Sequence, residues 1–386
     1  MKKFLYLCGM MLLSLNMMAQ IDLNDQNWHR VFDDEFDNHQ TWNPNTWISL
    51  PDGKWKAHPG KRITHDPYHQ VYQYDHCLFD VANGKMRLLA EYDPEAIQYH
   101  DYVLPDTMHG HYPNAYGQNN GLFYFSGEIE TTTKFRYGYF EIRCKLPVHR
   151  GAFPSFWLHA TSDTIGNSYY ASLDIFEYGW HITRPDIYPD SPEIGYKKRY
   201  TCALHYNDTA CVYDTNDIYN KAIFNLPFGS TGLDNYHKFS CEWMPDHVIW
   251  YFDGIEMNRC DNPNHIPRRS LTMKVNYGID NYYNYDSIIH GIWEGSDEML
   301  IDYIRIYQLD WDCSTDETIT CQSDLDGFDY AVKKSVSITS TIDAPVVGSG
   351  DNVTFRVADS FEVTGPFTVS NGAEFTVIQQ LCPSDE

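Results

Sequence analysis

The chain has 386 residues, a formal net charge of −25 and 42% hydrophobic residues. This charge repels nucleic acid and anionic membranes at long range, and the apolar share excludes a globally disordered chain. The 30 tyrosines and 10 tryptophans offer flat apolar faces with a polar edge, which suit both a protein core and a sugar ring.

Residues 1–19 have the pattern of a secretory signal peptide. Lys2 and Lys3 form a basic start, an apolar stretch covers residues 4–15, and Ala19 is a plausible cleavage residue. The stretch is too short to span a bilayer, and no later segment approaches 18 unbroken apolar residues. We therefore expect a secreted or periplasmic protein without a membrane span.

Nine cysteines follow the signal segment, and export allows disulfides. Cys202 with Cys211, and Cys313 with Cys321, are close enough in sequence to bridge. Sequence alone does not assign the pairs, and the odd number leaves at least one cysteine outside an internal bridge.

Alternation of apolar and polar residues dominates the chain. It appears at 137–147, at 237–257 with a tight turn at Asp253-Gly254, and at 298–309. No long run with the helical period occurs. The pattern predicts an all-β sandwich or barrel for residues 20–310.

The composition changes after residue 310. Residues 311–322 are polar and lack a strand pattern, so we expect a linker there. Residues 323–386 then form a small C-terminal β module, in which 352–378 hold short Val/Phe/Thr strands about every ten residues. This spacing favours a stacked, solenoid-like arrangement.

The segment YYASLDIFEYGW, residues 169–180, places two carboxylates in an aromatic, apolar run. In a strand Ser172 and Asp174 share a face, whereas Glu177 has the opposite parity. One β-bulge near Ile175 or Phe176 brings all three into one row. The neighbouring aromatic residues indicate a cleft with aromatic walls, so we count Tyr178 and Trp180 as candidate sugar contacts.

The segment Ser-Leu-Asp-Ile-Phe-Glu resembles the E-x-D-x-x-E motif of glycoside hydrolase family 16, with serine in place of the first carboxylate. This family of endo-acting β-glycanases includes laminarinases, lichenases, agarases, porphyranases and carrageenases. The resemblance implies a two-sheet antiparallel jelly roll with a long groove for a β-linked polysaccharide, either a β-glucan or a galactan such as agaran, porphyran or carrageenan. Further similar segments, in family order, are FDDEFD and NPNTW (32–47), TTTKFRYGYFEIRCKLP (131–147), GAFPSFWL (151–158), HKFSCEWMPDHVIWYFDG (237–254) and IDYIRIYQ (301–308).

The resemblance also implies roles for single residues. Glu177 falls on the acid/base position and Asp174 on the assisting carboxylate between the two catalytic acids. Trp157 and His205 fall on substrate-binding positions. Asp302 lies near a calcium ligand of some members, so a structural Ca²⁺ is possible, and no other cofactor is required.

Ser172 falls on the position of the nucleophile. A retaining glycosidase needs a carboxylate there, and a serine hydroxyl without an adjacent base does not replace it. The chain is then a glycan-binding protein that has lost catalysis, a variant whose introduced serine traps substrate, or an enzyme with another route. One such route places water between Asp174 and Glu177, and another takes the nucleophile from Glu141.

Overall fold

The structure is a computed structural model. It describes residues 23, 27–37, 53–57, 61–62, 70–72, 74–80, 82–93, 124–147, 152–161, 170–178, 199–209, 212–227, 229–279, 295–325, 327, 329–340 and 344–383. The predicted signal peptide lies outside the described residues.

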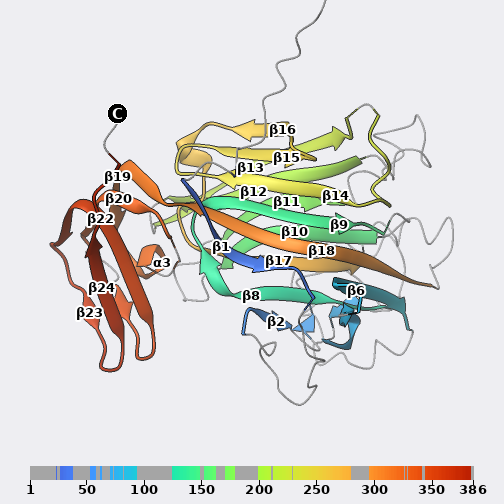
Figure 1. Cartoon of the computed structure of the whole chain (residues 1–386), viewed down its shortest axis with the longest axis horizontal. Coiled ribbons are helices and arrows are strands. Elements are labelled where there is room, and N and C mark those ends of the chain that lie inside the picture. Colours follow the sequence, from blue (N-terminus) through green and yellow to red (C-terminus); the bar gives the residue numbers. More distant parts are fainter. Residues whose placement is uncertain are drawn as a thin grey trace, which may run out of the picture.

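Two antiparallel sheets pack face to face and form the large domain (Figure 1). Within the described residues, one sheet has eleven strands and the other has seven. Between the described strands of these two sheets, every pairing is antiparallel except that of β4 with β7. The predicted all-β, two-sheet antiparallel sandwich is therefore confirmed.

The strands of the larger sheet are β1 (Trp28–Asp34), β3 (Lys61–Arg62), β4 (Gln70–Tyr72), β5 (Cys77–Asp80), β6 (Lys85–Tyr92), β7 (Tyr124–Ser126), β9 (Gly138–Lys145), β14 (His237–Trp243), β15 (Val248–Phe252), β16 (Ile255–Cys260) and β18 (Ser296–Leu309). The smaller sheet contains β2 (Trp55–Ala57), β8 (Glu128–Phe135), β10 (Ala152–Thr161), β11 (Tyr170–Glu177), β12 (Arg199–Thr209), β13 (Val212–Asn225) and β17 (Leu271–Ile279). Short 3₁₀ turns cover η1 (Tyr74–His76) and η4 (Pro263–His265).

The core lies between the inner faces of the two sheets. Phe176 of β11 packs on Phe239 of β14 with ring centroids 4.4 Å apart, and both side chains are buried. Trp250 of β15 crosses the same space, and its indole Nε1 donates to the backbone oxygen of Asp174 at 2.9 Å. The larger sheet thus fixes the backbone of the strand that carries the two carboxylates.

The predicted strands appear at their expected places. Residues 137–147 contain β9, residues 298–309 lie in β18, and 237–257 contain β14, β15 and the first half of β16. Asp253 and Gly254 have φ of 48° and 82°. Two successive residues with positive φ fit the two-residue hairpin turn that Asp-Gly favours.

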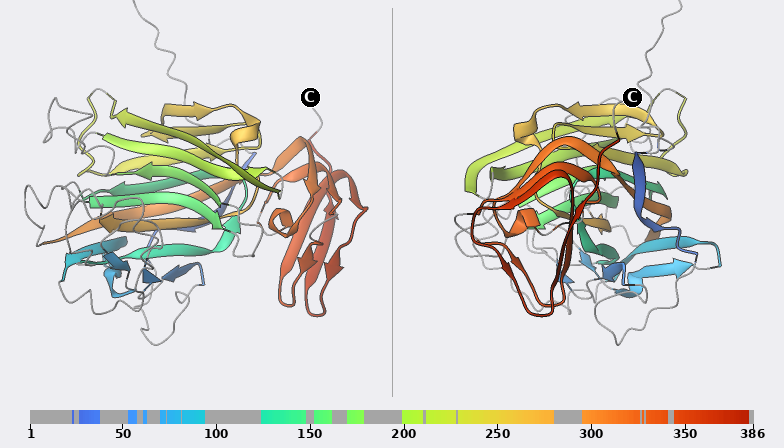
Figure 2. Two further views of the ribbon diagram at one scale, coloured as in Figure 1. Left: turned by 180° about the vertical axis from the view of Figure 1, so that it is seen from behind. Right: turned by 60° about the vertical axis from the view of Figure 1, so that its left-hand side comes forward.

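The C-terminal module is a parallel β-solenoid beside the sandwich (Figure 2). Successive strands pair in parallel, and the registers Asn352↔Glu374 and Val346↔Thr368 both advance by 22 residues. Each coil carries two strands, which agrees with the predicted spacing of about ten residues. The module comprises β19 (Trp311–Ile319), α3 (Gln322–Leu325), β20 (Val332–Ile338), β21 (Val346–Val347), β22 (Asn352–Val363), β23 (Thr368–Val369) and β24 (Glu374–Gln379).

The linker prediction for 311–322 was wrong. Trp311–Ile319 form β19, the first strand of the solenoid sheet, and pair in parallel with β20. The strand lacks an apolar pattern because polar cross-strand contacts hold it. One example is the Ser335 hydroxyl, which donates to the Asp316 carboxylate at 2.5 Å.

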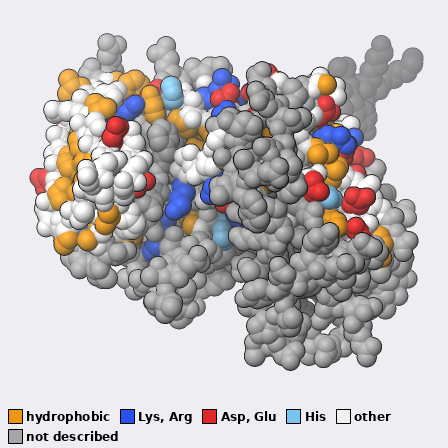
Figure 3. Space-filling view, turned by 90° about the horizontal axis from the view of Figure 1, so that it is seen from below, with side chains coloured by type: hydrophobic (Ala, Val, Ile, Leu, Met, Phe, Trp, Pro, Cys, Tyr) orange, Lys and Arg blue, Asp and Glu red, His pale blue; other side chains and the backbone are white. Residues whose placement is uncertain are grey.

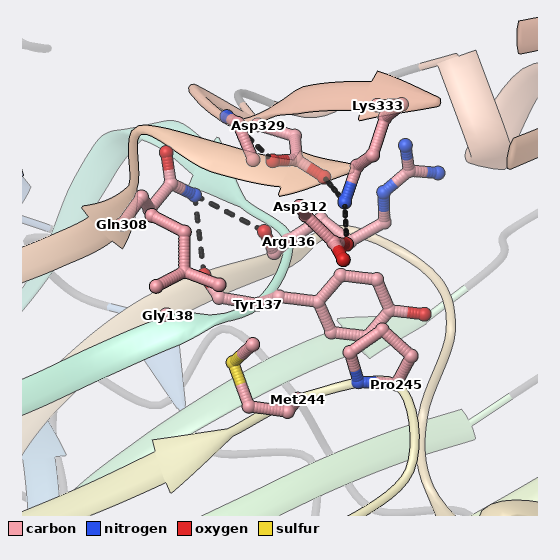
Figure 4. A pocket seen from close by; sticks show the side chains of 11 residues that line it. Arg136, Tyr137, Gly138, Met244, Pro245, Gln308, Asp312, Asp329 and Lys333 are labelled. Atoms are coloured by element: carbon pink, nitrogen blue, oxygen red, sulfur yellow. Dashed lines mark hydrogen bonds and ion pairs between the residues drawn. The ribbon is translucent and has the colours of Figure 1, made fainter. Parts of the chain in front are cut away.

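Buried charges lie where the solenoid meets the sandwich (Figure 4), and of these the pair of Arg136 with Glu317 links the two parts. The Lys333 ammonium lies 2.8 Å from the Asp312 carboxylate and 3.1 Å from that of Asp329. Beside it, Arg136 of the β8–β9 turn pairs with Glu317 at 3.2 Å. The side chains of Lys333 and Arg136 are only 6% and 4% exposed, so these pairs are largely removed from solvent.

The solenoid is also closed by a disulfide between Cys313 and Cys382. This pairing excludes the Cys313–Cys321 bridge that the spacing allowed. Cys202 is buried, and the second possible bridge involves Cys211, which lies outside the described residues. Hydrophobic side chains also lie on the solenoid surface (Figure 3), and the larger exposed ones there include Val363, Val369, Val377, Ile378 and Leu381.

Candidate active site on the seven-stranded sheet

A β-bulge shapes the strand that carries the carboxylates. β11 pairs with β10 through Phe176↔Phe156 and Asp174↔Trp157, so Ile175 is the extra residue. The pairing of β11 with β12 is interrupted at the same place. The predicted bulge is therefore confirmed, and it lies at Ile175.

The bulge brings Glu177 to the face that Ser172 and Asp174 share. Leu173, Ile175, Phe176 and Tyr178 all belong to the core cluster. Asp174, between Leu173 and Ile175, and Glu177, between Phe176 and Tyr178, therefore point to the opposite face. In a regular strand without a bulge, Glu177 would have the parity of the core residues, because it follows Ser172 by five positions. Asp174 and Glu177 thus lie on the outer face of the seven-stranded sheet.

Neighbouring strands extend this row sideways. Ser172 lies between His159 of β10 and His205 of β12, and Asp174 lies between Trp157 and Ala203. Glu177 lies between Ser155 and Thr201. Directly opposed residues in an antiparallel pair have Cβ atoms about 4.5–5.5 Å apart. The register therefore places the carboxylates beside two imidazoles and an indole.

Asp174 is held from several sides. The Ser172 hydroxyl donates to its Oδ1, and Nε2 of His205 lies 3.3 Å from its Oδ2. Its side chain is only 4% exposed, whereas the His205 side chain is 24% exposed. These contacts, with the Trp250 bond to the backbone, fix the orientation of the Asp174 carboxylate.

Trp157 is oriented by β17. Its Nε1 donates to Oδ1 of Asn276 at 2.7 Å, and the Lys274 ammonium lies 5.5 Å from the ring centroid. Lys274 in turn contacts Glu130 of β8 at 3.1 Å and Glu128 at 3.7 Å. Burial lowers the pKa of Lys274, but the two glutamates outweigh it and raise this pKa overall. The lysine therefore remains charged beside the indole at neutral pH.

The remaining predicted residues lie in different surroundings. Tyr178 is fully buried in the core cluster, so the structure places it in the protein interior and not along the row. Trp180 lies outside the described residues. Glu141 belongs to β9 of the other sheet, where its Oε1 accepts from the Tyr303 hydroxyl at 2.8 Å. Glu141 is therefore excluded as a nucleophile on this face.

Asp302 does not have the surroundings of a calcium ligand. Its two carboxylate oxygens accept from Lys85 and Arg143, and calcium prefers several uncharged or anionic oxygen ligands. Among the described residues, no group of three or more His, Cys, Asp or Glu side chains is placed to hold a metal. The described residues around Asp302 do not fit a bound calcium ion.

Sequence reasoning missed His159, Lys274 and Asn276 as members of this face. His159 follows Trp157 by two residues, and Asn276 follows Lys274 by two, so each pair shares a strand face. This alternation could have shown from the sequence that the residues of each pair point to the same face. It did not show that β10 and β17 lie side by side.

Comparison with known proteins supports the resemblance drawn from the motif. Residues 209–305 match the family model described as glycosyl hydrolases family 16. The chain is a relative of glycosyl hydrolases family 16. The family 16-like region is 26% identical over 301 residues to the endo-1,3-1,4-beta-glycanase EglC of Rhizobium meliloti, covering 73% of this chain and 52% of that protein.

A second relative, the glucan endo-1,3-beta-glucosidase A1 of Niallia circulans, is 24% identical over 218 residues, which cover 53% of this chain and 27% of that protein. The chain thus spans about half the length of the Rhizobium relative and less of this one. Among the described residues, no helix is long and apolar enough to cross a membrane.

Solved structures share the fold of the family 16-like region. One comes from work on endo-acting O-glycanases with which human gut bacteria initiate mucin breakdown. It has a TM-score of 0.52 and 18% identity, covering 74% of this chain and 92% of that chain. Porphyranase B of Zobellia galactanivorans has a TM-score of 0.50 and 17% identity, covering 73% and 93%. At these identities the likeness concerns the fold alone.

Proposed function

We propose that the chain acts on a β-linked polysaccharide that lies along the outer face of the seven-stranded sheet, with Glu177 as proton donor. The observation that carries the proposal is the bulge at Ile175, which puts Glu177 and Asp174 on one face beside Trp157. An indole held at its edge offers its flat side to a sugar ring. The names of the relatives, an endo-1,3-1,4-beta-glycanase and a glucan endo-1,3-beta-glucosidase, agree with this choice.

A second candidate function is binding without cleavage. It is favoured by Ser172, because the usual retaining mechanism requires a carboxylate nucleophile opposite the acid/base. The hydroxyl of Ser172 donates a hydrogen bond to Asp174, and Ser172 is buried. Both candidates share the glycan site and differ only in the fate of the glycosidic bond.

The test uses the full chain with Ser172→Glu and Glu177→Gln variants on laminarin, lichenan, agarose, porphyran and carrageenan. Release of oligosaccharides by the natural chain, lowered about 10²–10⁴-fold in Glu177→Gln, supports the enzyme. Cleavage by Ser172→Glu alone supports the binding protein. Failure of all three proteins to bind any of the glycans would refute both candidates.

We also infer that the chain is exported. The basic and apolar pattern of residues 1–19 supports this inference, as does the Cys313–Cys382 disulfide, since disulfides persist in oxidising compartments. Mass spectrometry of the protein recovered from its native host tests it, with cleavage near Ala19 as the expected result.

A further inference from the structure

We propose that the substrate is a β-linked glycan with a 2-acetamido group on the sugar at the scissile bond, and that the carbonyl oxygen of this group is the nucleophile. The inference rests on the proposed function, since it takes the glycan site and the proton donor Glu177 from it. It names the substrate class and the group that replaces the missing carboxylate.

Ser172 does not supply the nucleophile. The Ser172 hydroxyl donates a hydrogen bond to Oδ1 of Asp174. A carboxylate is far less basic than a serine alkoxide, so Asp174 does not remove the hydroxyl proton to make Ser172 a nucleophile. The imidazole of His205 lies against the other oxygen of Asp174. These two side chains therefore hold Asp174 in place, and Ser172 and His205 do not form a serine–base pair.

Asp174 is also poorly suited to attack the sugar. Both of its oxygens are engaged, one by Ser172 and one by His205, and its backbone oxygen accepts from Trp250. Attack at the anomeric carbon requires a carboxylate oxygen to leave such a partner and move towards the sugar. A fixed carboxylate serves better as a hydrogen-bond acceptor and as a counter-charge, because burial strengthens its interaction with a nearby cation.

The adjoining strands offer no substitute. β10 and β17 contain no acidic residue, and the β12 residues opposite the row are Thr201, Ala203 and His205. The next acids in these rows, Glu128 and Glu130, lie on β8, three strand spacings or about 14 Å from β11. Both are paired with Lys274. Among the described residues of this face, none places a free carboxylate at the nucleophile position, and we infer that the substrate supplies the nucleophile.

A 2-acetamido group meets this need, as it does in glycosidases with substrate assistance. Its carbonyl oxygen bonds to the anomeric carbon while the glycosidic bond breaks, and Glu177 gives its proton to the leaving oxygen. Asp174 accepts a hydrogen bond from the amide N–H and balances the positive charge of the cyclic oxazolinium. A carboxylate oxygen has a second lone pair for this bond.

The second half-reaction restores all groups. Glu177, now a carboxylate, takes a proton from water, and the water oxygen bonds to the anomeric carbon as the bond to the acetamide oxygen breaks. Two displacements at one carbon leave the β configuration unchanged. Ser172 and His205 act as positioning residues that keep Asp174 aligned in both steps.

The experiment compares aryl β-glycosides of matched oligosaccharides that carry at C2 a hydroxyl, an acetamido or a fluorinated acetamido group. We expect the full chain to cleave the acetamido compound with retention, as read by NMR of the first product. We also expect a roughly tenfold or larger fall in kcat for the trifluoroacetyl compound, because its carbonyl oxygen is a weaker nucleophile. The Asp174→Asn variant should lower kcat with little change in KM.

A matched control separates this inference from the proposed function. The Ser172→Glu variant should gain cleavage of the hydroxyl compound, which shows that Glu177 and the binding face are competent. Inversion of configuration, equal rates for the acetyl and trifluoroacetyl compounds, or glycan binding without cleavage by the natural chain would overturn the inference alone. Failure of every protein to bind any glycan would instead refute the proposed function.

Discussion

Lys333→Met tests the buried ion pairs within the solenoid, where it meets the sandwich. The substitution keeps most of the side-chain volume but removes the charge between Asp312 and Asp329, which lie 2.8 and 3.1 Å from the ammonium. The lysine side chain is 6% exposed and each carboxylate 12%, so solvent screens the remaining pair of acids weakly. Removing one partner of a buried ion pair costs about 3–5 kcal/mol, and we expect a loss of this size.

The pH dependence of this contribution follows from the lysine. Burial lowers the pKa of Lys333, but Asp329 and Asp312 outweigh it and raise this pKa overall. A pKa raised above the unfolded value means that the stabilisation is complete below about pH 10.4 and is lost as the pH rises further. Measurements at pH 7 therefore capture the full effect.

The assay is equilibrium urea unfolding followed by tryptophan fluorescence, with Lys334→Met as the matched control. Lys334 neighbours Lys333 in β20, but its side chain is 47% exposed and its partner Asp316 is 58% exposed. Exposed pairs of this kind contribute about 0–1 kcal/mol. Equal losses in the two variants would show that the junction charges do not stabilise the fold as the structure indicates.

Three further predictions concern the sandwich. Deleting Ile175 removes the bulge but leaves Asp174, Phe176 and Glu177 in regular alternation, so Glu177 should stay on the outer face and glycan binding should be retained; loss of glycan binding in a folded deletion variant would contradict the assignment of Ile175 as the extra residue. Phe176→Ala should cost about 3–5 kcal/mol in urea unfolding, and a loss below 1 kcal/mol would show that the site is not packed core. The hydrogen bond with Glu242 raises the pKa of His247 in the folded protein. The stabilisation from this histidine is therefore present below about pH 6.5 and lost as the pH rises through the pKa of the folded state. His247→Asn should lower the thermal midpoint more at pH 5.5 than at pH 8.5, and equal shifts at the two pH values would contradict this.

Sequence patterns showed where the strands lie in the chain better than they showed which strands lie side by side. Alternation found β9, β14 and β18, and the flanking turn residues found β15, whose five residues are all buried. It failed for β19, whose polar side chains pair with those of the adjacent parallel strand. A strand held by such contacts leaves no apolar period to detect.

For the candidate site as well, the sequence located residues but did not decide their surroundings. Tyr178 was an ambiguous residue, because an aromatic ring next to a carboxylate fits a sugar cleft and a core equally well, and the tertiary structure buries it. The motif left two possible positions for the bulge, and only the register with β10 places it at Ile175.

The sequence by itself determined that Ser172, Asp174 and Glu177 belong to one strand, since local spacing and side-chain parity are properties of a single segment. Only the tertiary structure decided that His205, Trp157 and Lys274 surround that strand and that Asp174 is held at both oxygens. These contacts join residues from separate strands, and which strands lie side by side depends on how two whole sheets bury their apolar faces against each other.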